Sequence, residues 1–172
     1  MGDDRALAIY KALLEHTRKL TLPVAASRFL FYSNEINHQD DWSTEDFRKE
    51  VQVDGDLGDR MKAAFAKAFE KHERVLIIGS DCASLTTEIV EAGFAALEQH
   101  DFVLGPALDG GYYLLGMNKY TSALFEAVPW STETVGQITR DRIEAMGKSC
   151  FLLPTLSDID FEEDWEKWGW EV

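Results

Sequence analysis

The sequence VLIIGSDC at residues 75–82 decides the fold. Its first four residues are all apolar, which is typical of a strand that helices cover on both faces. Polar residues follow at once, beginning with Gly79, Ser80 and Asp81. Ligands of open α/β sheets bind just beyond the carboxyl ends of the strands. The stretch therefore predicts a buried strand of an α/β sheet, with a candidate ligand site at its end.

Amphipathic helices are expected on either side of this strand. Residues 58–72 place Met61, Phe65 and Phe69 on one helical face, and residues 86–99 show the same spacing. The pattern predicts further helices at 4–20, 119–127, 133–146 and 161–170, strands at 27–32, 101–105, 111–116 and 150–153, and an irregular loop at 33–55. Such alternation is typical of a mainly parallel sheet covered on both sides. Without a repeat or a linker, residues 1–172 are expected to form a single domain.

The net charge of −14, from 17 basic and 31 acidic side chains, limits the partners of the protein. Nucleic acids and anionic membranes are not expected partners, because binding to either depends on lysine and arginine. An anionic small molecule is compatible if a bound cation or a local basic pocket offsets the acidic charge. The sequence shows no signal segment, and no apolar run nears the ~20 residues that span a bilayer. A cytoplasmic location is therefore expected.

Acidic side chains supply the candidate metal ligands. Asp81 follows the buried strand directly, while Asp158 and Asp160 are two residues apart and would point the same way in an extended segment. Carboxylates suit Mg²⁺ or Mn²⁺, which prefer oxygen ligands and often share them with substrate phosphates. Each position also has a structural alternative. Asp81 could cap the next turn, and Asp160, three residues before Glu163, has the spacing of a helix N-cap.

Two glycine-containing segments are candidate substrate contacts. Gly110 and Gly111 would let a substrate lie against bare backbone, with Asp109 accepting hydrogen bonds from hydroxyls or acting as a base. The alternative is an ordinary turn, because an Asp-Gly pair between strands is a turn signal. In the second segment, at 52–61, Arg60 is a candidate anion contact.

Taken together, these segments resemble one known family. Four blocks match it in order, with a fifth at Pro129-Trp130-Ser131-Thr132: GDLGDRM at 55–61, IGSDC at 78–82, LGPALDGGYYLLG at 104–116 and SDIDFEEDW at 157–165. The chain resembles, over nearly its whole length, the bacterial rSAM/selenodomain-associated transferases, also known as arsenosugar-biosynthesis glycosyltransferases. That family is similar to nucleotide-diphospho-sugar transferases of the GT-A fold, so the resemblance implies a Rossmann-like, three-layer α/β sandwich.

The resemblance also implies a function and a set of site residues. It implies a glycosyltransferase that uses a nucleotide-diphospho-sugar donor and a divalent metal, Mg²⁺ or Mn²⁺, with a nucleotide sugar or nucleotide as its small-molecule partner. Asp81 occupies the place of the metal-binding aspartate of GT-A enzymes, with Asp158 and Asp160 as further ligands. The expected catalytic residue is Asp109, and the expected substrate-binding residues are Gly79, Ser80, Gly110, Gly111, Tyr112, Asp56 and Arg60. A homo-oligomer is also compatible with the sequence.

One departure from the family pattern keeps two alternatives open. Family members begin with a strand and a loop resembling Pro-Gly-x-x-Lys-Thr-Arg-Leu, whereas this sequence begins at Met1-Gly2-Asp3-Asp4-Arg5 and is expected to be N-terminally truncated relative to them. The missing loop would normally contact the base and phosphates of the nucleotide. The alternatives are a nucleotidyltransferase that releases pyrophosphate, and a catalytically silent binding module.

Overall fold

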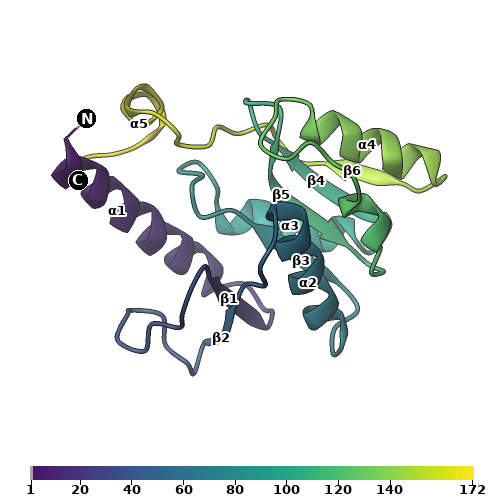
Figure 1. Ribbon diagram of the computed structural model, residues 1–172, viewed down its shortest axis with the longest axis horizontal. Helices are drawn as coiled ribbons and strands as arrows, with labels where there is room; N and C mark the ends of the chain where they lie inside the picture. The colour runs from purple at the N-terminus through teal and green to yellow at the C-terminus, as the bar shows by residue number, and fades with distance from the viewer. Residues whose placement is uncertain (1) are drawn as a thin grey trace.

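A four-stranded sheet forms the centre of the computed structural model, which describes residues 2–172 (Figure 1). The strands lie in the order β3 (Val75–Ile78), β5 (Tyr112–Met117), β4 (Phe102–Pro106) and β6 (Cys150–Leu152). β5 is antiparallel to both β3 and β4, whereas β6 is parallel to β4. Three of the four strands therefore run in one direction, as a mainly parallel sheet requires.

A second, two-stranded sheet lies apart from the first. β1 (Arg28–Tyr32) pairs in parallel with β2 (Phe47–Val51), in a register that sets Arg28 opposite Phe47. The prediction of an irregular loop over the whole of 33–55 was therefore wrong for residues 47–51. The apolar-polar signal of β2 is weak, because Arg48 is exposed and Lys49 and Glu50 are engaged in ion pairs rather than in the core.

Helices cover both faces of the four-stranded sheet and confirm a three-layer α/β arrangement. One face packs against α2 (Leu57–Phe69), the 3-10 helix η1 (Ser122–Phe125) and α4 (Val135–Ala145). The other face packs against α3 (Thr87–Ala96) and the end of α1 (Asp3–Thr21). β4 shows why two cores form: Phe102 and Leu104 point into the first core, and Val103 between them points into the second.

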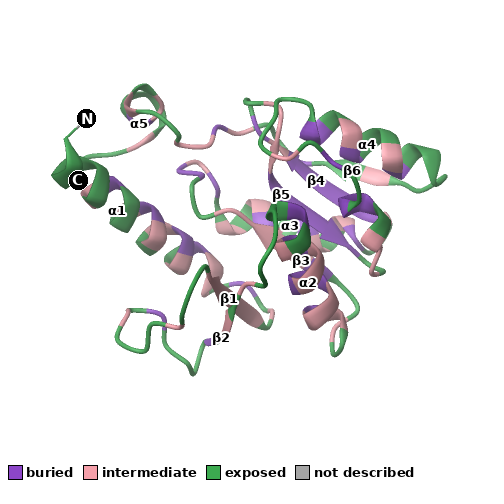
Figure 2. Cartoon of the chain, viewed as in Figure 1, coloured by how far each residue is buried: buried purple, intermediate pink, exposed green. Residues whose placement is uncertain are grey.

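Burial follows this layering (Figure 2). β4 and β5 lie inside the sheet and are almost wholly buried, whereas β1 and most of β3 are only half-buried. Packing of apolar side chains is the main source of stability in such a domain. The most stable part of the molecule is therefore expected to be the β4–β5 pair and the helices on it.

The C-terminal segment returns to the N-terminal helix. α5 (Glu162–Trp168) buries Trp165 in a small core with Ile9 and Leu13 of α1 and with Ala83, and the two chain ends lie close together (Figure 1). This packing fixes the segment before α5, which contains Asp158 and Asp160, relative to the end of β3.

The predicted helix at 119–127 is present only as the short η1. Arg142 of α4 explains the irregular backbone beside it, because its guanidinium donates to the carbonyls of Ala123, Leu124, Glu126 and Ala127. Ala127 adopts a positive φ of 48°. Carbonyls that serve as acceptors for a side chain no longer need to bond within a helix.

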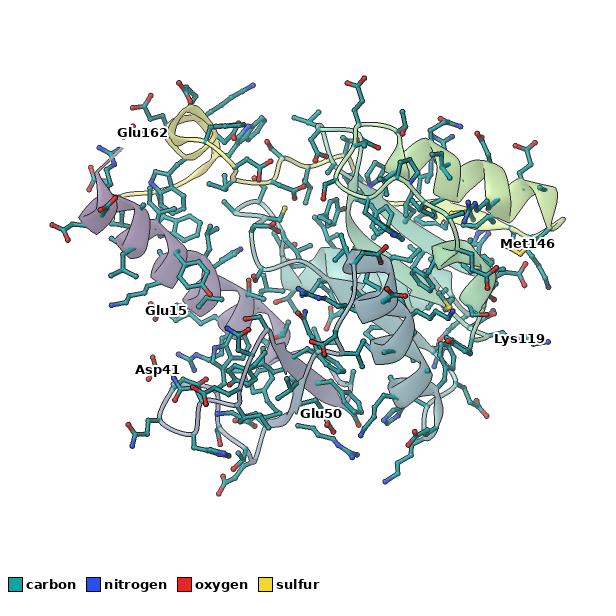
Figure 3. All side chains as sticks on the ribbon, in the orientation of Figure 1. Glu15, Asp41, Glu50, Lys119, Met146 and Glu162 are labelled. Carbon is teal, nitrogen blue, oxygen red and sulfur yellow. The ribbon has the colours of Figure 1, made fainter. Side chains whose placement is uncertain are left out.

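The two-stranded sheet is tied to α2 by charged side chains. Glu50 of β2, labelled in Figure 3, pairs with Lys67 of α2 at 3.4 Å and with Arg48 at 2.9 Å. Such partly exposed pairs contribute little free energy. Within residues 2–172, no helix is both long and apolar enough to cross a membrane.

Candidate functional site

A cavity of about 1720 Å³ opens between the two sheets and reaches the carboxyl end of β3. Its lining at that end includes Gly79, Ser80, Asp81, Tyr112 and Asp158. These five residues were singled out from the sequence, and Arg60, a sixth, also lines the cavity. The carboxyl end of a strand is where α/β proteins bind ligands.

Asp81 projects from the end of β3 into this cavity. A Cβ atom on Gly79 would lie only 2.5 Å from Asp81 Oδ1, so glycine at 79 leaves the space that the carboxylate occupies. Although the side chain is open to solvent in the cavity, the protein around it raises its pKa by desolvation, and the negative charges of Asp160 and Asp109 raise it further. The carboxylate form of Asp81 is therefore disfavoured unless positive charge lies nearby.

Asp158 comes from a segment 77 positions later and meets Asp81 at the same place. The backbone N–H of Ile159 donates to the carbonyl of Asp81 at 2.9 Å, which joins the two segments. Burial raises the pKa of Asp158 to about 7, and the charge of Asp81 contributes next, followed by Asp109 and Asp160. Its Oδ1 is buried without a hydrogen-bond partner in residues 2–172. A buried acceptor that lacks a partner is costly unless a ligand or ion supplies one.

These features fit a divalent cation held jointly with a ligand. Within the described residues 2–172, no three His, Cys, Asp or Glu side chains converge to form a metal site by themselves. Mg²⁺ and Mn²⁺, however, are commonly bound by one or two carboxylates together with substrate phosphates and water. Asp81 and Asp158 would supply those two carboxylates, with the partnerless Oδ1 of Asp158 as one of the ligand atoms.

Asp160 lies beside this pair but is exposed. It is near enough for its charge to raise the pKa of both Asp81 and Asp158. It is not the N-cap of α5: that place belongs to Phe161, and the Asp164 carboxylate accepts from the backbone of both Asp160 and Phe161. The side chain of Asp160 is thus not used as the cap.

Positive charge enters the cavity from α2. Arg60 lines it with a half-buried side chain, donating from Nη1 to Gln52 Oε1 at 3.3 Å. Its Nε is buried and has no hydrogen-bond partner among residues 2–172. A guanidinium with a free donor suits phosphate oxygens.

Asp56, predicted as a substrate contact, forms the N-terminal capping box of α2 in the structure. Its carboxylate accepts from the Asp59 backbone at 2.9 Å, and the Asp59 carboxylate accepts from the Asp56 backbone at 3.3 Å. Asp56 is exposed and is not part of the cavity lining. Asp56 starts α2 and thereby places Arg60.

The loop between β4 and β5 is held by the Asp109 side chain and by a contact with α4. Asp109 accepts from the Gly111 N–H at 2.8 Å, and Gly110, at φ +93°, accepts from the Gly136 N–H at 2.9 Å. A Cβ on Gly110 would lie 2.0 Å from the carbonyl oxygen of Glu133. The bare backbone of Gly110 thus packs against the start of α4, while the exposed Asp109 still contributes charge to Asp81 and Asp158.

Tyr112, the first residue of β5, follows this loop and lines the cavity, as Tyr113 does. Its ring is half-buried, its hydroxyl lies 3.9 Å from the sulfur of Met61, and burial raises its pKa above the ordinary value. It therefore stays protonated at neutral pH and offers a hydrogen-bond donor.

The sequence analysis did not single out a polar group of the cavity lining formed by Tyr32, at the end of the predicted strand 27–32, and by Asn37 and Asp40, from the predicted loop. The Tyr32 hydroxyl donates to Asp40, and Lys49, whose side chain is 5% exposed, reaches Asp40 at 2.6 Å. Burial alone would raise the pKa of Asp40, but hydrogen bonds from Lys49 and Tyr32 lower it on balance. A tyrosine at the end of a strand, followed by polar residues, was the available signal.

Comparison with known proteins assigns the chain to a family. Residues 17–132 match the model of a family described as "Uncharacterized protein conserved in bacteria (DUF2064)". No curated protein matches the chain in sequence.

Solved structures share the fold. A Desulfovibrio desulfuricans G20 protein, named as a "putative nucleotide-diphospho-sugar transferase", superposes with a TM-score of 0.86 at 28% identity, over 93% of this chain and 72% of that one. Rv0371c from Mycobacterium tuberculosis H37Rv has a TM-score of 0.54 at 9% identity, over 92% of this chain and 81% of that one. A complex of Rv0371c with manganese has a TM-score of 0.56 at 10% identity, over 92% of this chain and 84% of that one. The Rv0371c structures support the Rossmann-like fold alone.

Proposed function

The chain belongs to the DUF2064 family, and we propose that it is a transferase acting on a nucleotide-diphospho sugar with the help of Mg²⁺ or Mn²⁺. The observation that carries the proposal is the buried, partnerless Oδ1 of Asp158 beside Asp81 on a cavity that also contains Arg60. The Desulfovibrio protein, named as a "putative nucleotide-diphospho-sugar transferase", supports the donor class. The choice of cation rests on the carboxylate oxygens that Asp81 and Asp158 offer.

Each residue of the cavity has a part in this proposal. Asp81 and Asp158 would hold the cation, which would neutralise charge on the leaving diphosphate. Arg60 would bind a phosphate oxygen through its free Nε–H. Gly79 and Ser80 would allow the donor to approach the backbone at the end of β3. Asp160, exposed beside the pair, would act through its charge or through water.

The loop between β4 and β5 would form the acceptor side of the site. Asp109, at the rim, would accept a proton or hydrogen bond from an acceptor hydroxyl, and Tyr112 would donate one from its protonated phenol. Gly110 and Gly111 would set the position of Asp109 rather than line the ligand. Asp56 would contribute through α2.

A narrower assignment belongs to the same proposal. The five sequence blocks support membership of the rSAM/selenodomain-associated, arsenosugar-type transferases. A cytoplasmic location, a single domain and a homo-oligomer are compatible with it.

Titration calorimetry with UDP or GDP, with and without Mn²⁺, tests the proposal. Wild-type protein is expected to bind at least one nucleotide only when Mn²⁺ is present. Asp81→Asn and Asp158→Asn are each expected to abolish this binding. The melting temperature should change little or rise, because burial and the neighbouring carboxylates disfavour the charged form of both residues in the free protein. Asp141→Asn, an exposed position on α4, is the matched control and should bind as wild type.

Two results would contradict the proposal. Mn²⁺-independent binding, or unchanged binding by both variants, would remove the carboxylates from the site. If binding is seen, release of pyrophosphate from a nucleoside triphosphate would favour the nucleotidyltransferase alternative. Absence of any nucleotide binding would favour a silent module.

A further inference from the structure

β6 forms an outer edge of the four-stranded sheet and pairs with another strand on one side only. In the sheet order β3-β5-β4-β6 its neighbour is β4 (Figure 1). Their parallel register sets Phe102 opposite Cys150 and Leu104 opposite Leu152. Among residues 2–172, no strand pairs with the other side of β6. That side therefore carries a short row of backbone donors and acceptors without a strand partner.

The hydrogen bonds to β4 show which residues of β6 have backbone groups on the open side. The N–H of Leu153, just after β6, donates to the carbonyl of Leu104 at 2.9 Å. Alternate residues of a parallel strand bond to the same neighbour, so the odd-numbered residues of this stretch bond to β4. The N–H and carbonyl groups of Cys150 and Leu152 therefore point away from β4.

The side chains along this edge are uncharged, and two of them are exposed and apolar. Phe151 and Leu152 are 41% and 42% exposed, and Cys150 is half-buried. Charged side chains commonly protect an edge strand against pairing with another chain. β2 at the edge of the other sheet has such residues at its centre, at 48–50, whereas β6 has none. The edge of β6 is therefore open to pairing.

The open edge of β6 is complementary to a second copy of itself. A twofold axis beside Phe151 would set two β6 strands antiparallel, with Cys150 of each copy opposite Leu152 of the other. These are the two residues whose backbone groups point outward, so each such pair would exchange two hydrogen bonds. The two Phe151 residues would form the non-hydrogen-bonded pair between them, in which side chains come closest.

Charge also favours this edge for self-association. Two chains with a net charge of −14 repel each other, so they approach most easily through an uncharged surface. Burial raises the pKa of Cys150 to about 11, and the nearby positive charge of Arg140 opposes part of this shift. Lys148, just before β6, pairs with Asp101 at 3.1 Å. The charged groups that act on this edge are thus basic or paired, in a chain that is acidic.

We propose that β6 is a dimerisation edge, on which a second copy of the chain pairs its own β6 antiparallel about a twofold axis. The two four-stranded sheets would then form one continuous sheet. No residue of β6 lines the cavity of the candidate site, so the inference is independent of the proposed function.

The expected dimer is weak, because the contact is short. Pro154 lacks an N–H and ends the edge soon after β6. Standard interfaces bury about 800 Å² per partner, and a contact of a few residues is smaller, so we expect dimers only above about 10 µM.

Sedimentation equilibrium of the full chain tests the proposal. Wild-type protein should be monomeric at about 1 µM and largely dimeric at about 300 µM. Added salt should strengthen the dimer, because it screens the repulsion between two acidic chains.

Two variants test the edge itself. Leu152→Pro removes an outward N–H that β4 does not use, and should weaken the dimer at least about tenfold. Phe151→Arg, which sets like charges opposite each other, should do the same. Leu7→Arg, at a 51% exposed apolar position on α1, is the matched control and should associate as wild type. Circular dichroism at about 1 µM checks that each variant is folded as a monomer.

A disulfide cross-link tests the register. In the proposed pairing the two Cα atoms at position 151 would lie about 4.5 Å apart, within the range that a disulfide joins. Phe151→Cys, combined with Cys150→Ala, should therefore form an oxidised dimer at least about tenfold faster than Leu7→Cys combined with Cys150→Ala.

Four results would overturn the proposal. They are a monomer at every concentration, unchanged association of the folded edge variants, equal cross-linking of the two cysteine variants, and a dimer that salt weakens. The last result would assign self-association to charged surfaces elsewhere on the chain. If Leu152→Pro does not fold, Phe151→Arg and the cross-link still decide the question.

Discussion

The surroundings of Asp158 disfavour the charged form of its carboxyl group. Burial and the neighbouring carboxylates raise its pKa from 3.8 to about 7, whereas in the unfolded chain it titrates near the ordinary value. Between these values the folded protein binds more protons than the unfolded one, so the free energy of unfolding falls as pH rises from about 4 to 7. Well above pH 7 this residue lowers the free energy of unfolding no further.

Asp158→Asn should therefore stabilise the metal-free protein at pH 8, because asparagine removes the opposed charge and keeps the shape. We expect a gain of roughly 1–3 kcal/mol at pH 8 and almost none at pH 4.5. Urea denaturation in the presence of EDTA measures both values. Asp141→Asn should show no such pH dependence. A destabilised Asp158→Asn at pH 8 would mean that the carboxylate makes a favourable contact in the free protein.

Among individual residues, the sequence could predict that Asp81 and Asp158 would lie near one sheet edge, whereas their metal-binding role stays a prediction. Asp81 had to lie at the end of a buried strand, and Asp158 lies on the cavity too. The capping roles could not be assigned in this way. Phe161 replaces Asp160 at the start of α5, since Asp164 reaches back to both backbone N–H groups, and Asp56 caps α2. Short-range competition among neighbouring aspartates decides such cases.

Among the structural elements, the loop between β4 and β5 depends on one glycine. Gly110 has a positive φ and packs its α-carbon against the Glu133 carbonyl, where a Cβ would lie 2.0 Å away. Gly147, after α4, also has a positive φ of 66° but has nothing within 4 Å of a Cβ. Comparing substitutions at Gly110 and Gly147 therefore separates the free-energy cost of backbone strain from that of a steric clash.

Gly110→Ala should lower the free energy of unfolding by about 3 kcal/mol or more, whereas Gly147→Ala should cost only about 1 kcal/mol for its left-handed backbone. Urea denaturation of the two variants measures the difference. Equal losses would show that α4 moves away from the loop without resistance. Loss of Mn²⁺-dependent nucleotide binding in Gly110→Ala alone would connect this packing to the site.

Element types were predictable wherever the apolar spacing was strong, as in α1, α2 and β4. β2 was missed because three consecutive charged residues, Arg48 to Glu50, form its centre and only Phe47 is buried, so the strand carries no clear period. The helix at 119–127 was predicted too long. Helix propensity does not include the contact of Arg142, a residue of α4, whose guanidinium donates to carbonyls between residues 123 and 127. Both errors come from tertiary contacts that a local pattern does not contain.

For the whole molecule, stability is expected to be uneven. The β1–β2 pair contacts the rest of the protein through few residues, while β4 and β5 are buried between two cores. Native-state hydrogen exchange should show β1 and β2 amides exchanging through openings of lower free energy than those of β4 and β5. Equal protection in both sheets would indicate that they unfold as one cooperative unit.

The layered α/β arrangement was predictable from the sequence, but the division into two sheets was not. The apolar pattern of a strand indicates whether its two faces are buried, and here helices bury them. The pattern carries no information on whether each edge of the strand pairs with another strand. That β1 and β3 each pair with a strand on one side only could be known only from the structure.

Cys82 gives the site a chemical reporter of its own. The thiol is 2% exposed, directly follows Asp81, and has a pKa raised by burial, and next by the charge of Asp158, to about 12. Because thiolate is the reactive form, alkylation in the folded state is suppressed by both access and protonation. The rate at which iodoacetamide labels this one cysteine, read by peptide mass spectrometry, therefore reports local openings of the chain next to Asp81, and a cation bound by Asp81 and Asp158 would slow it.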